Sequence, residues 1–152
     1  MALSDIRIVL TRPKYGGNVG SVCRAMMNMG LSKLVLVDPS PEITDLDVRR
    51  FALRAEPLWP GADRASDPPQ TVADCATVLS TTARDGRPTA GTRAQPPRRR
   101  GVPLLPESDN APAAIVFGPE DHGLSNDELK LATTSCRSST PEFSSLNLSR
   151  WC

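Results

Sequence analysis

A short apolar strand runs directly into a glycine-bounded loop in the stretch Ala114-Ile115-Val116-Phe117-Gly118-Pro119-Glu120-Asp121-His122-Gly123-Leu124. Farther along the chain, a second loop that is rich in small hydroxyl residues reads Ser144-Ser145-Leu146-Asn147-Leu148-Ser149. Glycine allows a ligand to approach the backbone closely, and exposed backbone amides and carbonyls match the donors and acceptors of an adenine edge. The two loops together therefore predict a site for a nucleotide-like ligand.

A third element lies near the N-terminus, where the apolar strand 6–10 leads to a glycine turn that opens a helix, Gly16-Gly17-Asn18-Val19-Gly20-Ser21-Val22-Cys23-Arg24-Ala25. We call residues 16–25, 117–124 and 144–149 the first, second and third motifs. In this order they resemble the three motifs of the SpoU branch of the SPOUT methyltransferases, which methylate ribose 2′-hydroxyls of tRNA or rRNA with S-adenosylmethionine. With Met27-Asn28-Met29-Gly30-Leu31, the chain is most similar to the tRNA anticodon-loop cytidine/uridine methyltransferases.

Four short aliphatic runs, residues 6–10, 34–37, 77–79 and 114–117, are bounded by turn residues and predict strands. Their apolarity is continuous rather than alternating, which indicates burial on both faces. We therefore predict an α/β fold with a mostly parallel sheet covered by helices on both faces. The resemblance implies in addition a deep C-terminal trefoil knot (the SPOUT fold), in which the last segment passes through a loop and builds the cofactor pocket.

At 152 residues the chain is long enough to bury a core and short enough for one domain. We expect a single SPOUT methyltransferase domain over residues 1–152, without the helix that the family places after the third motif. The segment from Pro57 to Pro69, rich in proline and glycine, is predicted to be a loop. The segment from Gly86 to Pro112 is predicted to be a mobile substrate loop or a disordered insertion.

Helical periodicity follows the first glycine turn, and one face of this helix should pack on the sheet, with its methionines as core filler. The residues on that face are Val19, Val22, Cys23, Met26 and Gly30. The residues on the opposite side are Ser21, Arg24 and Asn28. Another helix should begin at Ser125, which can form a capping box with Glu128.

The resemblance implies a catalytic set drawn from all three motifs. Its members are Asn18, Arg24, Glu120, Ser145 and Asn147. The arginine of the first motif, Arg24, would help to activate the 2′-hydroxyl and would contact an RNA phosphate. Because a guanidinium stays protonated and is a poor base, orientation and charge stabilisation are the roles that physical chemistry favours for it.

Each of these residues also has a structural interpretation. Arg24 could form an ordinary ion pair on a helix surface, Asn18 could cap the helix, and Glu120 could complement a helix dipole. His122 is expected to be a solvated loop residue rather than a base. Asn147 is harder to explain in this way, because an asparagine between two leucines would bury an amide that needs specific partners.

The cofactor that the resemblance implies is S-adenosyl-L-methionine, held by three segments of the chain. These segments are Thr81-Thr82-Ala83, Gly118-Pro119-Glu120 and Ser145-Leu146-Asn147. A formal net charge of +1 gives no global basic field, so RNA must be held by local patches. The candidates for RNA binding are Arg24, Arg84, Arg98, Arg99 and Arg100. An arginine run between prolines and glycines is at least as compatible with a solvated loop.

The cysteines are widely scattered without a paired C-x-x-C spacing, and the chain has a single histidine, so we expect no metal. Neither a secretory leader nor an apolar run of about twenty residues is seen, so we expect no membrane partner, a cytoplasmic location and reduced thiols. The partners that the resemblance implies are tRNA or rRNA and a second copy of the chain in a homodimer, in which the arginine of the first motif completes the site of the other copy.

A rival hypothesis is a catalytically impaired RNA-binding or dimerisation module that retains the fold without turnover. The motif residues favour the enzyme, whereas the missing terminal helix favours the rival. A nucleotide-binding regulator built on a phosphate loop is a third hypothesis, and it is excluded because the chain has no G-x-x-x-x-G-K-[ST] motif.

Overall fold

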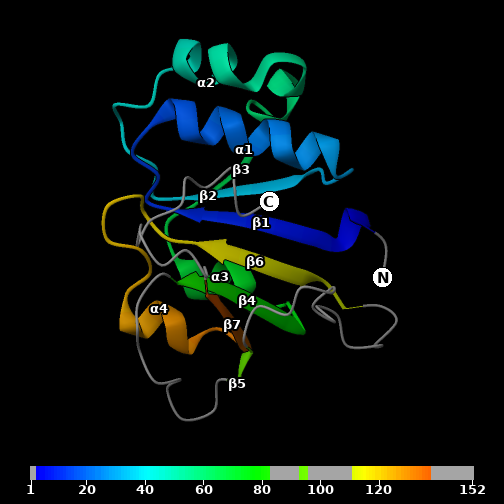
Figure 1. Ribbon diagram of the computed structural model, residues 1–152, viewed down its shortest axis with the longest axis vertical. Helices are drawn as coiled ribbons and strands as arrows, with labels where there is room; N and C mark the ends of the chain where they lie inside the picture. The colour runs from blue at the N-terminus through cyan, green and yellow to red at the C-terminus, as the bar shows by residue number, and fades with distance from the viewer. Residues whose placement is uncertain (1–2, 83–92, 96–110, 138–152) are drawn as a thin grey trace.

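A parallel sheet of seven strands runs through the part of the chain that the computed structural model describes, residues 3–82, 93–95 and 111–137 (Figure 1). The strand order is β3-β2-β1-β6-β4-β7-β5, and every neighbouring pair is parallel. The strands are β1 (Ile6–Thr11), β2 (Lys33–Val37), β3 (Asp63–Ala65), β4 (Thr77–Thr82), β5 (Arg93–Gln95), β6 (Ala113–Phe117) and β7 (Thr134–Arg137). The helices are α1 (Gly16–Asn28), α2 (Asp45–Ala52), α3 (Pro68–Val72) and α4 (Asn126–Lys130), with short 3-10 helices η1 (Leu3–Asp5) and η2 (Leu53–Leu58).

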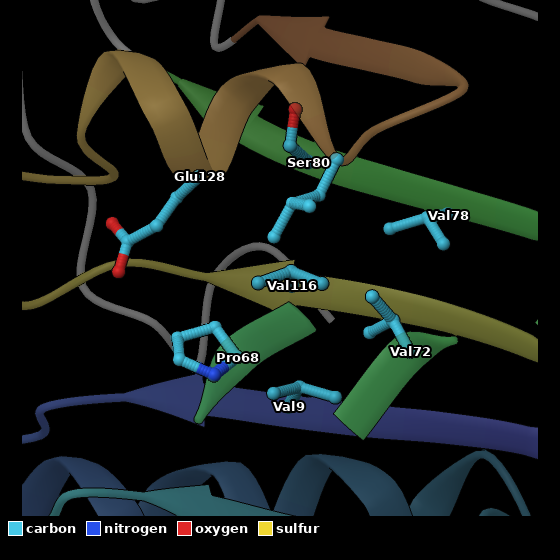
Figure 2. A pocket seen from close by; sticks show the side chains of 8 residues that line it. Val9, Pro68, Val72, Val78, Ser80, Val116 and Glu128 are labelled. Carbon is cyan, nitrogen blue, oxygen red and sulfur yellow. The ribbon is translucent and has the colours of Figure 1, made fainter. Parts of the chain in front are cut away.

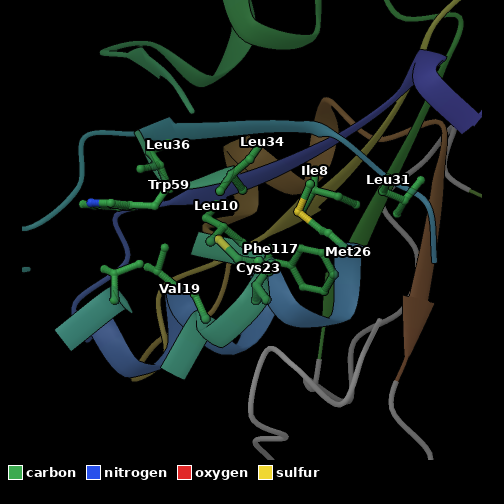
Figure 3. Packing of buried hydrophobic residues seen from close by; sticks show 14 residues of the cluster. Ile8, Leu10, Val19, Cys23, Met26, Leu31, Leu34, Leu36, Trp59 and Phe117 are labelled. Carbon is green, nitrogen blue, oxygen red and sulfur yellow. The ribbon is translucent and has the colours of Figure 1, made fainter. Parts of the chain in front are cut away.

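Helices cover both faces of the sheet (Figure 1). On one face, α1 contributes Val19, Cys23 and Met26 to a buried cluster that also contains Phe117 of β6 (Figure 3). On the other face, α3 and the residues around α4 pack against valines of the strands, with Val72 of α3 as an example. The predicted α/β fold, a mostly parallel sheet with helices on both faces, is therefore confirmed.

The four strands predicted from aliphatic runs are all present, with slightly wider bounds. β1 lies near the centre, with Val9 opposite Val35 of β2 on one side and opposite Val116 of β6 on the other. Ile8, Val9 and Leu10 are at most 1% exposed. This burial is what continuous apolarity predicts for a strand covered on both faces.

The helix α1 buries most of the face that its periodicity predicts. The side chains of Val19, Val22, Cys23 and Met26 are 0% exposed. Gly30 does not belong to this face, because α1 ends at Asn28 and Gly30 is exposed with a φ of 73°. Glycine takes this left-handed backbone readily and so stops the helix. Met27 and Met29 are 44% and 49% exposed, so the prediction of methionine as core filler holds for Met26 and is wrong for these two.

The prediction of a loop from Pro57 to Pro69 is wrong. The segment contains the end of η2, the strand β3 and the start of α3. β3 has three residues, of which Asp63 and Arg64 are exposed, and it pairs with β2 at an edge of the sheet. An edge strand this short carries no apolar pattern to detect. Pro68 is the first residue of α3, a position that suits proline because its missing N–H would have no partner there.

The helix α4 begins where the sequence predicts it. The Oγ of Ser125 accepts a hydrogen bond from the backbone N of Glu128 at 3.2 Å, and Oε2 of Glu128 accepts one from the backbone N of Ser125 at 2.7 Å, which completes the capping box. Between Gly86 and Pro112, only β5 and residues 111–112 are described. The third motif and the predicted knot fall on residues 138–152, outside the described residues.

The helices α1 and α2 approach each other closely at the glycines of α1. A Cβ atom at Gly20 would lie 2.3 Å from the carbonyl oxygen of Val48 and 2.9 Å from the backbone nitrogen of Ala52. Both neighbours are backbone atoms of α2, so they could give way only if the whole helix moved. Gly20 therefore serves helix packing, which accounts for one glycine of the first motif without reference to a ligand.

We predict that Gly20→Ala destabilises the fold by about 2 kcal/mol, because the added methyl group forces α2 away from α1. The free energy of unfolding is measured by chemical denaturation with circular dichroism. Gly61→Ala is the matched control, since a Cβ at Gly61 would have its nearest neighbour, the carbonyl oxygen of Pro57, at 3.4 Å. Equal stability of the two variants would contradict the close approach of the helices.

Candidate functional site

The carboxyl ends of β1, β6 and β4 meet at one edge of the sheet, because these strands are adjacent and parallel. Leu10 of β1 lies opposite Phe117 of β6, and Oγ1 of Thr11 donates a buried hydrogen bond of 2.8 Å to the carbonyl oxygen of Phe117. The loop that leads into the first motif and the loop of the second motif therefore start side by side. Open α/β sheets place their ligands at this edge.

Glu120 connects the second motif to the first. Its Oε1 accepts hydrogen bonds from Nδ2 of Asn18 at 3.0 Å and from the backbone N of Tyr15 at 3.4 Å, and its Oε2 accepts one from the backbone N of Lys14 at 3.0 Å. Tyr15 is the N-cap of α1 and offers no side-chain cap, and the carboxylate of Glu120 lies beside this end of the helix. The structural interpretation of Glu120, complementing a helix dipole, is therefore supported by its position.

Asn18 and Glu120 are the two members of the catalytic set that the structure brings into contact. The alternative that Asn18 caps α1 is wrong, because the N-cap lies three residues earlier at Tyr15. The side-chain amide of Asn18 instead donates to the carboxylate of Glu120. One hydrogen bond thus links the first and second motifs.

Arg24 is exposed on the side of α1 that faces away from the sheet, as its place in the helical period predicts. Within the described ranges no acidic side chain forms an ion pair with it, so a surface ion pair is not seen there. The side chain of His122 is 78% exposed, and its Nε2 lies 3.4 Å from Oδ2 of Asp121. This exposure agrees with the expected loop residue.

Two ion pairs between the segments that follow β1 and β6 were not predicted from the sequence. Both terminal nitrogens of the Arg12 guanidinium donate to the carboxylate of Glu128, Nη1 to Oε1 at 2.5 Å and Nη2 to Oε2 at 3.0 Å. The ammonium of Lys14 binds the carboxylate of Asp121. The signal for these pairs is the opposite charge of two loops that follow neighbouring parallel strands, and it becomes visible only once β1 and β6 are known to be adjacent.

The hydrogen bond with Arg12 lowers the pKa of Glu128 below its ordinary value of 4.5. Its ionised form therefore adds stability above about pH 4.5, and this contribution disappears as the pH falls through the lower pKa of the folded state. We predict that Glu128→Gln is less stable than wild type at neutral pH and that the difference shrinks below pH 4.5. Thermal unfolding across this pH range measures it. A difference that stayed constant with pH would show that the carboxylate charge does not contribute.

The predicted cofactor segments offer mainly backbone groups to a ligand. Thr81 is buried, and its Oγ1 donates to the carbonyl oxygen of Val116 at 3.3 Å, so its side chain is used within the sheet. A Cβ at Gly118 would lie 2.3 Å from the backbone C of Gly123 and N of Leu124, so the loop that follows β6 folds back on its own start. Backbone donors and acceptors beside a strand end are of the kind that can match the edge of an adenosine group.

Several predicted site residues lie outside the described residues. They are Ala83, Arg84, Arg98, Arg99, Arg100, Ser145, Leu146 and Asn147. Thr82 is the last residue of β4 and pairs with β7, which places its backbone at the same edge as Gly118. The described part of the predicted site is therefore gathered at the carboxyl edge, except for Arg24, which lies farther along α1.

A small cavity lies on the other face, between the sheet and the helices α3 and α4 (Figure 2). Its lining is mostly apolar and includes Val9, Val78 and Val116 together with Ser80 and Glu128. Its volume is about 10 Å³, whereas pockets for small molecules measure about 300 Å³ or more. The cavity is therefore a packing gap that could hold a water molecule, and it is not the cofactor site.

Among residues 3–82, 93–95 and 111–137, no group of three or more His, Cys, Asp or Glu side chains is placed to hold a metal ion. In the same ranges no helix has the length and apolarity needed to cross a membrane.

Comparison with known proteins agrees with this geometry. A family model described as the SpoU rRNA Methylase family matches residues 5–150. The tRNA (cytidine/uridine-2′-O-)-methyltransferase TrmJ of Pectobacterium atrosepticum is 41% identical over 147 residues, which make up 96% of this chain and 60% of that protein. The chain thus spans about 60% of the length of the curated relatives that it matches.

Solved structures show the same fold. A probable methylase family protein from Haemophilus influenzae Rd KW20 has a TM-score of 0.78 at 30% identity, over 99% of this chain and 62% of that one. TrmJ from Z. mobilis ZM4 has a TM-score of 0.74 at 33% identity, over 95% of this chain and 64% of that one. Both similarities extend over nearly the whole of this chain.

Proposed function

Because the chain belongs to the SpoU rRNA Methylase family, we propose that it transfers a methyl group from S-adenosyl-L-methionine to a ribose 2′-hydroxyl of tRNA. The name of the 41% identical relative, a tRNA (cytidine/uridine-2′-O-)-methyltransferase, supports tRNA and a pyrimidine nucleotide. The family description names rRNA, which is the alternative substrate. The observation that carries the proposal is the hydrogen bond between Asn18 and Glu120, because it joins two motifs at the edge where α/β folds bind ligands.

We assign the cofactor to the ends of β4 and β6. Thr81, Thr82 and Gly118 would hold it through backbone groups, with Pro119 buried beside them. Ala83, Ser145, Leu146 and Asn147 complete the assignment from outside the described residues. When bound, this cofactor supplies an electrophilic methyl group on a sulfonium.

The nucleophile in this reaction is the ribose hydroxyl of the substrate, so the chain must orient it and stabilise its developing charge. We assign this role to Arg24, whose exposure on α1 leaves its guanidinium accessible to a macromolecule. Asn18 and Glu120 hold the start of the helix that carries Arg24. Glu120 accepts three hydrogen bonds, which supports a role in orientation rather than in proton transfer.

A homodimer in the cytoplasm completes the proposal. Large apolar side chains are exposed at both ends of α1, with Tyr15 62%, Met27 44% and Met29 49% exposed. Aromatic residues and methionine are enriched at protein interfaces. The free thiols of Cys23 and Cys75 fit a reducing compartment.

We predict that wild-type protein binds S-adenosylmethionine in calorimetry and methylates tRNA, and that Arg24→Ala lowers kcat by about 100-fold while cofactor affinity is unchanged. The reason is that Arg24 is assigned to ribose and phosphate rather than to adenosine. Methyl transfer is measured with radiolabelled cofactor, and the modified riboses are mapped.

Arg50→Ala is the matched control, because Arg50 is an exposed arginine on the neighbouring helix α2. It should retain full activity. Cofactor binding without methylation of either tRNA or rRNA by wild-type protein would favour the rival, an impaired RNA-binding module. Full activity of Arg24→Ala would remove that residue from the site.

For the arginine run, we predict that replacing Arg98, Arg99 and Arg100 together by alanine weakens RNA binding and flattens its salt dependence. Each lost phosphate contact reduces the slope of log affinity against log salt by about 1. Fluorescence titration with tRNA at several salt concentrations measures this slope. An unchanged slope would assign the run to a solvated loop.

A further inference from the structure

The two loops at the carboxyl edge are tied together by acids of one and donors of the other. We call the contacts Arg12–Glu128, Lys14–Asp121 and Glu120 with Asn18 the inter-loop clamp. Every acid in the clamp comes from the segment after β6, and every donor from the segment after β1. The clamp therefore fixes the start of α1 relative to the second motif.

The pair of Arg12 and Glu128 is the stronger charged contact in the clamp. The side chain of Glu128 is 10% exposed and also accepts from the backbone N of Ser125, so its removal from water is compensated by several donors. The side chains of Lys14 and Asp121 are 44% and 36% exposed, and exposed pairs contribute little. Arg12, whose own side chain is 40% exposed, thus holds the start of α4, whereas Glu120 holds the second motif itself.

The role of the Arg12 side chain can be tested separately from the role of its backbone conformation. Arg12 has a φ of 47°, in the left-handed region that favours glycine, and its backbone N donates to the carbonyl oxygen of Val37 at 2.7 Å. Asp38 at the end of β2 has the same φ of 47° and the same kind of bond, from its backbone N to Ala65 at 2.9 Å. Glycine could satisfy this backbone at either position, so the guanidinium of Arg12 contributes the ion pair and not the turn.

We propose that Arg12 is a positioning residue: through Glu128 it holds the start of α4, directly after the loop of the second motif, against the start of α1, and so sets where Asn18 lies relative to Gly118. This inference rests on the proposed function. Arg12 itself contacts neither cofactor nor ribose. Its effect arises because methyl transfer needs the acceptor oxygen in line with the methyl donor, and small misplacements lower the rate strongly.

The test is Arg12→Gly, with Asp38→Gly as the control at the matching backbone position. Arg12→Gly should lower kcat by about 10- to 100-fold and leave KM for tRNA nearly unchanged, because the residue does not touch RNA. Asp38→Gly should keep wild-type kcat. Arg12→Lys should recover part of the loss, since an ammonium can still bind one oxygen of Glu128.

Thermal unfolding and hydrogen exchange separate positioning from general destabilisation. Arg12→Gly should unfold at a lower temperature than Asp38→Gly, because it also loses the ion pair with Glu128, but it should remain folded at the assay temperature. The amides of Lys14 and Tyr15, which bind Glu120, should exchange faster than in Asp38→Gly. A loss of activity that follows the unfolded fraction would overturn the proposal. So would a raised KM with a reduced salt slope, because it would make Arg12 an RNA contact.

The two proposals can fail independently. If the wild-type protein methylates no RNA, the proposed function fails, and the exchange rates of Lys14 and Tyr15 in Arg12→Gly still decide whether the clamp holds the loops. If wild type is active and Arg12→Gly matches it in kcat, the positioning role of Arg12 is wrong while the proposed function stands.

Discussion

The parallel pairing of β1 with β6 is the interaction on which the site depends. It brings together loops that are about a hundred residues apart in the sequence, since Leu10 lies opposite Phe117. The buried hydrogen bond from Oγ1 of Thr11 to the carbonyl oxygen of Phe117 fixes the register of the two strands at the point where both end. A shift of this register would separate Glu120 from the amides at the start of α1 and would break the clamp at the same time.

Much of the fold could be predicted because its signals are local. Continuous aliphatic runs predict four of the strands, β1, β2, β4 and β6. The helix α4 begins at a capping box formed by Ser125 and Glu128. The failures also have local causes. β3 pairs through its backbone at a sheet edge and shows no apolar pattern, and α3 is too short to show a period. Met27 is exposed because it lies on another side of α1 than Met26, and Met29 is exposed as the C-cap just beyond the end of the helix.

The candidate site could be predicted only in part, because motifs identify residue types and not their partners. The sequence singled out Asn18 and Glu120, but it did not show that one binds the other. Arg12 and Lys14 lie before the first motif and carry no signature of their own. Their partners follow from strand order, which is a long-range property of the sheet. The roles assigned to Ser145 and Asn147 come from the resemblance, and both lie outside the described residues.

The clamp also decides what a polyanion meets at the carboxyl edge. A free carboxylate about 4 Å from a phosphate would repel it by about 1 kcal/mol in water. Asp121 and Glu128 do not act in this way, because each is paired with a cation of the neighbouring loop. The second motif and α4 can therefore carry several acids and still border a surface that a nucleic acid is able to approach.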